Sequence, residues 1–137
     1  MTIQLSVAVR NAMLDALETA IGTGAVVKLR SGSPPANAAA ADAGTVLASM
    51  TLASDWMAAA ASGSKNFSSL PIEDTSADAV GTLGHYRVYA SGGATCHMQG
   101  TITVTGGGGD MTVDAVSVVA AQDIKITAWS LNMNGHA

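Results

Sequence analysis

From Val26 onward, polar and apolar residues alternate along the chain with a period of two. In "AVVKLRSG", Val27 and Leu29 alternate with two basic residues, and "TVLASMTL" repeats the pattern. Successive side chains of a β-strand point to opposite faces, so such segments bury one face and leave the other polar. This rhythm predicts half-buried β-strands over most of the chain.

The segment before this rhythm has the period of a helix. Its apolar residues recur at spacings of three and four, at Val9, Ala12, Met13, Ala16, Leu17, Ala20 and Ile21. Ser6 stands where an N-cap is expected, and glycines follow the last apolar residue. We expect an amphipathic helix over residues 7–22 that buries this apolar side and turns Asn11, Asp15 and Glu18 away from it.

Four consecutive glycines, Gly106 to Gly109, separate two alternating segments. If Val104 faces Met111 in an antiparallel pair, the flanking residues stay in phase and the glycines form a four-residue turn. A phosphate-binding loop would need Lys followed by Ser or Thr and then a helix, whereas Asp110 and a strand follow here. The run predicts a β-hairpin turn, and anion or metal binding at its tip is the less favoured alternative.

Seven or eight short strands joined by glycine-rich turns can be counted along the chain. With the helix, they predict a mainly β fold: an antiparallel β-sandwich or jelly roll with one N-terminal amphipathic α-helix. The 137 residues fit a single domain, 1–137. We expect residues 1–6 to form an N-terminal extension and "SGSPPANAAAADAG", residues 31–44, to form an exposed Pro/Ala-rich loop.

Charge is scarce in this chain. Charged residues make up 12% of it and the net charge is -4, with no basic cluster, so nucleic acid is not an expected partner. The longest apolar run is far shorter than the roughly 20 residues that span a bilayer, so no membrane association is expected. The first residues lack the basic region of a signal peptide, which predicts a protein that is not secreted. The single cysteine excludes an intramolecular disulfide and a cysteine-based zinc site.

No group of residues in the sequence supports catalysis. Cys96 and His97 are neighbours on a strand and point to opposite faces, which prevents a nucleophile–base pair. We expect Cys96 in the core with the apolar residues of its strand, and no role for His136. Trp56 and Trp129 are expected as core anchors or interface residues rather than sugar-stacking platforms. The acidic residues are dispersed through turns. We therefore predict no enzyme and no cofactor.

A polar patch is predicted on the strongest hairpin of the chain. His85, Arg87 and Tyr89 share one face of their strand, and His97 is expected beside them on the next strand. Two histidines without a nearby carboxylate make a poor metal site. We interpret the patch as a solvated or interface-facing strand surface and predict no metal there.

Four stretches cover nearly the whole chain: "VRNAMLDALETAIGTGAVVKLRSGSPPANAAAADAGTVLASMTL", "SDWMAAA", "GHYRVYASGGATCHMQGTITVTGGGGDMTVD" and "IKITAWSL". Together they resemble a family of small structural proteins of tailed bacteriophages and prophages. The resemblance rests on strand and turn segments rather than on a catalytic motif. It implies a virion component assembled in the cytoplasm of a bacterial host, and we favour a capsid decoration or cement protein that binds and stabilises the shell.

The partners expected from this resemblance are the major capsid protein, further copies of the chain and, for a tail location, tail proteins. Besides the hairpin patch, the interface candidates lie in the extension and the loop: Ile3, Gln4, Pro34, Pro35 and Asn37. A tail, neck or fibre structural protein is the first alternative, distinguished by copy number per particle. A carbohydrate-binding module is the second, and it would require an exposed Trp or Tyr.

Overall fold

The computed structural model describes residues 3–68 and 70–133, and that part contains one helix and nine strands. They are α1 (Val7–Ile21), β1 (Val26–Ser31), β2 (Val46–Thr51), β3 (Ser64–Asn66), β4 (Ile72–Asp74), β5 (Gly81–Tyr89), β6 (Cys96–Val104), β7 (Met111–Val113), β8 (Ser117–Val118) and β9 (Ile124–Asn132). The mainly β class with one N-terminal helix is confirmed. Residues 1–2 of the expected extension, and His136, lie outside the described residues.

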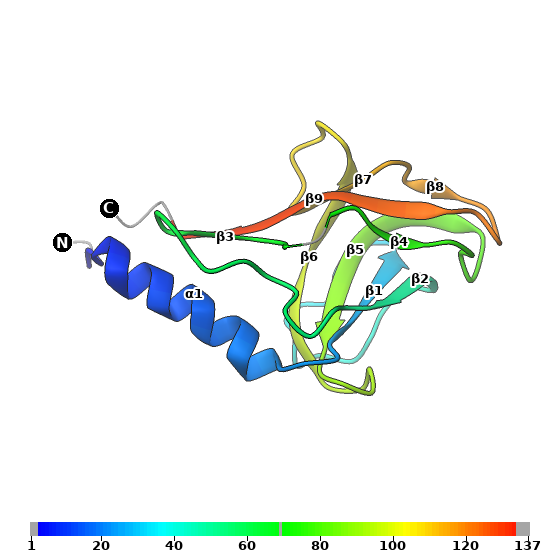
Figure 1. Cartoon of the computed structure of the whole chain (residues 1–137). Coiled ribbons are helices and arrows are strands. Elements are labelled where there is room, and N and C mark those ends of the chain that lie inside the picture. Colours follow the sequence, from blue (N-terminus) through cyan, green and yellow to red (C-terminus); the bar gives the residue numbers. More distant parts are fainter. Residues whose placement is uncertain (1–2, 69, 134–137) are drawn as a thin grey trace.

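The strands form one curled, mixed sheet, a half-barrel, in the order β2-β1-β5-β6-β7-β9-β3 (Figure 1). In addition, β4 pairs with β9 and β8 pairs with β5. This arrangement is broadly compatible with the predicted sandwich or jelly roll. The central strand β5 pairs antiparallel with β1 on one side and with β6 on the other.

An aromatic cluster fills part of the core. The ring of Trp129 on β9 stacks on Phe67 with centroids 3.6 Å apart and meets Tyr86 edge-on at 5.0 Å. Trp56 lies 6.3 Å from Trp129, and Tyr89 is buried outside this cluster. All five aromatic residues of the chain are therefore buried, and the prediction that both tryptophans are core anchors is confirmed.

The four-glycine run is a turn, as expected, but the strands that it joins are parallel. Met111 pairs with Ile102, so the prediction that Met111 faces Val104 in an antiparallel hairpin is wrong. The loop folds back along β6 because Thr103 Oγ1 accepts a hydrogen bond from Gly109 N at 2.9 Å. β7 then continues the sheet by pairing antiparallel with β9, and no helix follows the glycines.

The helix α1 lies away from the half-barrel, alongside β3 and the end of β9, and with them forms a projecting arm (Figure 1). Its bounds match the prediction within one residue, and Ser6 Oγ accepts from Val9 N at 3.3 Å as the N-cap. No helix among the described residues is long and apolar enough to cross a membrane.

Candidate functional site

Loop 31–44 is not a free arm, because it folds over the outer face of β1 and β5. Beneath it, His85 is 0% exposed and Arg87 and Tyr89 are each 1% exposed. The interpretation of these three residues as a solvated or interface-facing surface is therefore wrong, because loop 31–44 of the same chain covers them. His97, the fourth member of the expected patch, is exposed.

Asp42 fixes the loop to the sheet. Its Oδ1 accepts from Arg87 Nη1 at 2.6 Å and from the Tyr89 hydroxyl at 2.7 Å, and its Oδ2 accepts from Arg30 Nη2 at 2.6 Å. The side chains of Arg30 and Arg87 are 7% and 1% exposed, whereas that of Asp42 is 40% exposed. One carboxylate thus forms ion pairs with two buried guanidinium groups.

The strand register explains why an acid is needed at this position. Lys28 on β1 pairs with Arg87 on β5, and Arg30 pairs with His85. Like charges directly opposite each other on neighbouring strands are destabilising. Asp42, the only acid of loop 31–44, supplies the compensating charge. The sequence signal for this contact is one acid in an alanine-rich loop beside strands that carry several cations.

The hollow between this loop and the sheet has a volume of about 480 Å³, and Arg87 lines it. Arg87 Nε donates to Cys96 Sγ at 3.1 Å, and Nη2 donates to the carbonyls of Ala38 and Ala40 at 2.6 and 3.1 Å. Together with the bond from Nη1 to Asp42, every guanidinium nitrogen has a partner. The arrangement ties the loop down, because four of the five guanidinium N–H groups donate to the same chain.

Cys96 lies under the loop rather than in the core. Its Sγ accepts from Arg87 and donates to the carbonyl of Met98 at 3.4 Å. A bulge between Val88 and Tyr89 shifts the register of β6 and places Cys96 opposite Tyr89, so the prediction of a core position is wrong.

The loop itself is preorganised by bonds within it and by one bond from β6. Asn37 Oδ1 accepts from Ala39 N at 3.0 Å and Ala40 N at 2.9 Å, and Gln99 Nε2 donates to the Pro35 carbonyl at 2.6 Å. Of the interface candidates in the loop, Asn37 is exposed and Pro34 and Pro35 are half-buried. Several small apolar side chains also face outward, at Ala36, Ala39, Ala41 and Ala43.

The ion pairs of Asp42 predict an acid-dependent loss of stability. Burial raises the pKa of Asp42, but the Tyr89 hydrogen bond and the charges of Arg30 and Arg87 outweigh burial and lower the pKa below 3.8. A carboxyl with a lowered folded pKa stabilises the fold fully above its unfolded pKa, and this stability is lost as the pH falls through the folded value. We expect the free energy of unfolding in urea to drop below about pH 4. The drop should be smaller in Asp42→Asn, and equal pH dependence in both proteins would contradict this expectation.

On the arm, the side of α1 that faces the fold carries a row of polar side chains beside the buried Leu14 and Ile21. Side chains of α1 accept hydrogen bonds from backbone amides of residues 57–63, in the pairs Asn11–Gly63, Asp15–Ala60 and Glu18–Met57, at 2.9, 2.9 and 3.0 Å. Residues three and four apart share one face of a helix, so the three acceptors form a row along α1. That row caps amides of segment 57–63, which lies next to β3 at the sheet edge.

Lys65 on β3 links the sheet to α1 through buried ion pairs. Its side chain is 3% exposed, and Nζ lies 2.7 Å from Asp15 Oδ1 and 3.1 Å from Glu18 Oε2. Nζ also donates to the Ala58 carbonyl at 2.9 Å. Burial lowers the pKa of Lys65, but the bonds to Asp15 and Glu18 outweigh burial, so the pKa is raised.

Replacing Lys65 with methionine is expected to loosen α1. The change leaves Asp15 and Glu18 without their cation, and we expect the free energy of unfolding to fall by about 2 kcal/mol. This value is below that of a fully buried pair, because the Asp15 side chain is 47% exposed. Thermal unfolding by circular dichroism and hydrogen exchange of α1 would measure the effect. The matched control is Lys125→Met, since Lys125 is 40% exposed and pairs only with surface acids. Equal losses in the two variants would refute the role of Lys65.

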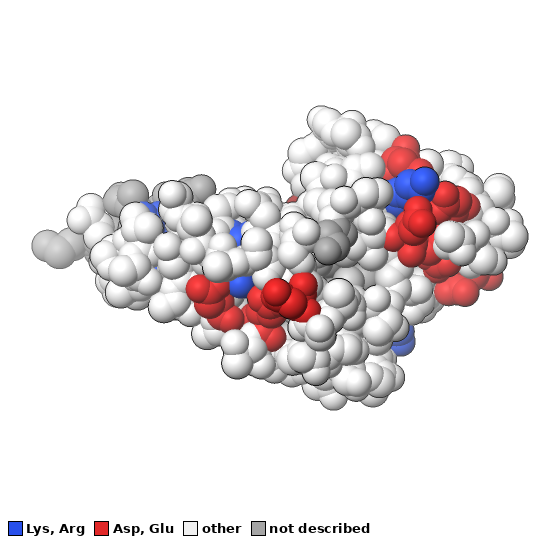
Figure 2. Space-filling view, in the orientation of Figure 1, with Lys and Arg blue, Asp and Glu red and all other residues white. Residues whose placement is uncertain are grey.

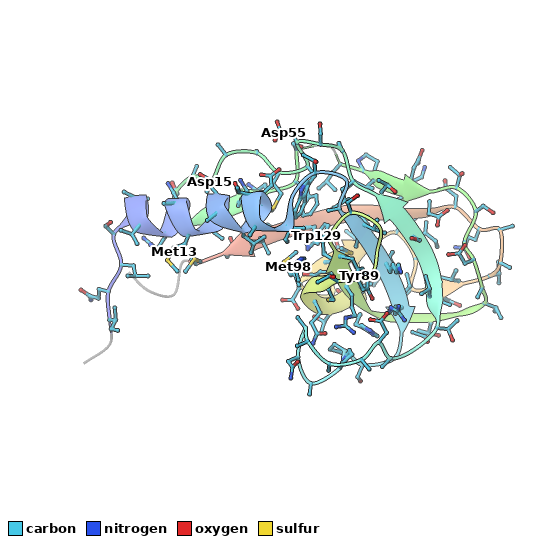
Figure 3. All side chains as sticks on the ribbon, turned by 90° about the horizontal axis from the view of Figure 1, so that it is seen from below. Met13, Asp15, Asp55, Tyr89, Met98 and Trp129 are labelled. Carbon is cyan, nitrogen blue, oxygen red and sulfur yellow. The ribbon has the colours of Figure 1, made fainter. Side chains whose placement is uncertain are left out.

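The opposite side of α1 is apolar, and the described residues leave it uncovered. Val9 and Met13 are 46% and 49% exposed, whereas Leu14 is 4% exposed. Met13 and Asp15 project from opposite sides of the helix (Figure 3). The prediction that Val9 and Met13 are buried is therefore wrong, because the polar row of α1 takes the inward side. In Figure 2 wide areas of the surface are uncharged, and the charged side chains gather in a few groups.

The remaining sequence candidates lie at the N-terminal end of the arm. Ile3 is 79% exposed and Gln4 is also exposed, so both are accessible as interface residues.

Within residues 3–68 and 70–133, no three His, Cys, Asp or Glu side chains are grouped so that they could hold a metal ion. Comparisons of the chain with protein-family models, curated proteins and solved structures found no match.

Proposed function

We propose that this chain is a non-enzymatic structural subunit of a tailed-bacteriophage particle, and that it acts as a decoration or cement protein on the capsid shell. The observation that carries the proposal is the orientation of α1, which uses its polar side within the fold and presents Val9 and Met13 outward. A contiguous apolar surface on a soluble protein marks a contact with another chain. The resemblance described above directs that contact to a virion.

Loop 31–44 is the proposed contact with the major capsid protein. The bonds of Asp42 and Asn37 hold the loop in one conformation before any partner arrives. Such preorganisation reduces the entropy lost on binding. The outward alanines of the loop also offer a neutral surface that desolvates at low cost.

Edge-to-edge pairing of sheets is not part of the proposal, because bonds cover the β2 edge. Asp74 Oδ2 accepts from Ser49 N at 3.0 Å, and Asp78 N donates to the Leu47 carbonyl at 2.8 Å. Edge strands blocked in this way resist pairing with a second sheet. Copies therefore meet the shell and each other through helix and loop surfaces.

Two other functions are alternatives for this sequence. A carbohydrate-binding module has no observation in its favour, because all five aromatic residues are buried. A tail, neck or fibre protein shares the same surfaces and differs in copy number. Decoration places hundreds of copies on the shell, whereas a tail role places few copies or stacked rings.

The test is imaging of particles that carry a tagged copy of the chain. We expect label over the whole shell, and loss of at least about nine-tenths of it in an Ala36→Glu, Ala39→Glu double variant. The double variant Val80→Glu, Val119→Glu is the matched control, because it adds the same two charges at exposed apolar residues outside the loop and arm. Label confined to the tail, or full occupancy by the double variant, would contradict the proposal.

A further inference from the structure

The helix α1 has two apolar sides, of which its own fold covers one. Ile21 belongs to the core, Leu17 packs against it and Leu14 is buried, while the uncovered side consists of Val9, Ala12, Met13, Ala16 and Ala20. We call these five residues the outer face. A helix that is apolar on both sides is typical of a buried position between two partners. One partner is the arm of the same chain, where β3 and segment 57–63 lie beside the helix, and the second is missing from a single copy.

The outer face carries no charge. The ionisable residues of α1 are Arg10, Asp15 and Glu18, and they are engaged with Met133, Ala60 and Met57 of the same chain. A neutral face neither attracts a charged partner nor repels an identical one. It is therefore suited to contact with a second copy of itself.

Side-chain size along the outer face favours one relative orientation of two copies. The large residues, Val9 and Met13, are in the N-terminal half of α1, and the small residues, Ala16 and Ala20, are in the C-terminal half. In an antiparallel pair about a two-fold axis, Met13 meets Ala16 and Val9 meets Ala20. Large side chains then fill the space beside small ones, whereas a parallel pair places large against large.

The two ends of α1 support the same orientation. The first turn of α1 has no acidic residue and the last turn has no basic residue, so neither end of the dipole is compensated within the chain. In an antiparallel pair, the N-terminal end of each α1 lies beside the C-terminal end of the other, so the two dipoles compensate each other. In that arrangement the first turn of one copy also lies near Asp55, which lines a hollow at the end of the other copy's α1.

That hollow also gives the exposed N-terminal segment a place to bind. It measures about 340 Å³ and is lined by Glu18, Thr19, Gly22, Thr23, Ser54 and Asp55. Ile3 is 79% exposed and precedes α1, which begins at the tip of the arm and ends at the half-barrel (Figure 1). An antiparallel partner brings residues 3–6 of each copy next to the hollow of the other.

We propose that two copies of this chain associate through the outer faces of α1, antiparallel about a two-fold axis, with residues 3–6 of each copy against the hollow of the other. This inference deepens the proposed function, because it assigns the contact between copies to a surface distinct from loop 31–44.

The fifteen residues of α1 span about 22 Å, so a strip about 10 Å wide covers about 220 Å² per copy. That area is below the roughly 800 Å² per partner of a stable complex, even though the N-terminal segments enlarge it. We therefore expect a dimer with a dissociation constant in the micromolar range.

Sedimentation equilibrium of the purified chain from about 1 μM to about 1 mM tests this proposal. We expect a monomer–dimer equilibrium that weakens by at least about tenfold in both Ala16→Glu and Met13→Lys. Using both charge signs separates a local effect from a change in net charge, and an unchanged thermal unfolding curve shows that each variant folds. Val119→Glu is the matched control and should dimerise as the parent does. A parent chain that stays monomeric throughout, or equal weakening by Val119→Glu, would overturn the dimer.

Cross-linking tests the orientation. In a Cys96→Ser background, Met13→Cys and Ala16→Cys are placed on separately tagged copies and the mixture is oxidised. We expect the disulfide to join the two differently tagged copies. Cross-links formed only between two Met13→Cys copies or two Ala16→Cys copies would contradict the antiparallel arrangement. Shell occupancy is measured with loop variants that leave α1 intact, so failure of the dimer and failure of the proposed function are told apart.

Discussion

Replacing Asp42 with asparagine is expected to lower the free energy of unfolding by about 3 kcal/mol. Asparagine keeps the size of the side chain but removes the charge that Arg30 and Arg87 share at 2.6 Å. Both guanidinium groups are almost fully buried, so the variant leaves two cations without a counter-ion. Breaking a buried ion pair on one side costs about 3–5 kcal/mol, and the lower end applies because the Asp42 side chain is 40% exposed.

Urea unfolding at pH 7 measures this loss, and Asp123→Asn provides the control. Asp123 also pairs with a cation, Lys125 at 3.3 Å, but both side chains are at least 40% exposed. An exposed pair contributes less than about 1 kcal/mol. If Asp42→Asn is no more destabilising than Asp123→Asn, then Asp42 does not hold loop 31–44 on the sheet.

Replacing Trp129 with alanine is expected to cost about 4 kcal/mol of unfolding free energy. The ring is 3% exposed and contacts Phe67, Tyr86 and Trp56, so truncation leaves a cavity bordered by three aromatic rings. Small domains are stable by only about 5–15 kcal/mol, so the change removes a large part of the total. Trp129→Phe keeps a ring against Phe67 and should lose about half as much.

Far-ultraviolet circular dichroism is the suitable probe for these two variants, because both remove a tryptophan and alter fluorescence directly. The same experiment bears on the carbohydrate-binding alternative, in which an exposed tryptophan binds a sugar and its removal leaves stability unchanged. A loss below about 1 kcal/mol in Trp129→Ala would contradict the core role.

The bounds of α1 could be predicted from local sequence, whereas the side that it buries could not. Ser6 and the spacing of apolar residues predict α1 within one residue. The same helix carries apolar residues on both sides, so periodicity alone cannot decide which side is buried. The buried side is determined by the hydrogen bonds of Asn11, Asp15 and Glu18. Their partners lie some forty to fifty residues away on segment 57–63.

The pairing of β6 with β7 shows a similar limit. Alternation places Ile102 and Met111 on the same face whether the strands run parallel or antiparallel, so the pattern is satisfied by both arrangements. The choice depends on the bond between Thr103 and Gly109, which folds the loop back along β6. It also depends on the pairing of β7 with β9.

The burial of the polar face of β5 also could not be predicted from the alternation of residues in the sequence. A strand whose polar residues alternate with apolar ones is ordinarily half-exposed, and Arg87 and Tyr89 fit that pattern. Their burial depends on Asp42, which is 45 residues before Arg87 and compensates its charge. The position of a single acid in a loop is visible in the sequence, but its partner is set by the fold.

The rate at which peroxide oxidises Met13 tests the central claim most directly, namely that α1 docks by the side that carries Asn11, Asp15 and Glu18 and presents the outer face to another chain. The measurement compares the parent chain, at a concentration above the dimer dissociation constant, with Ala16→Glu. Met57 is 1% exposed and serves as the internal reference for an intact core. We predict slow oxidation of Met13 in the parent and fast oxidation in Ala16→Glu, with Met57 unreactive in both. Equally fast oxidation of Met13 in the two proteins would contradict the account, because it would show that no second chain covers the outer face.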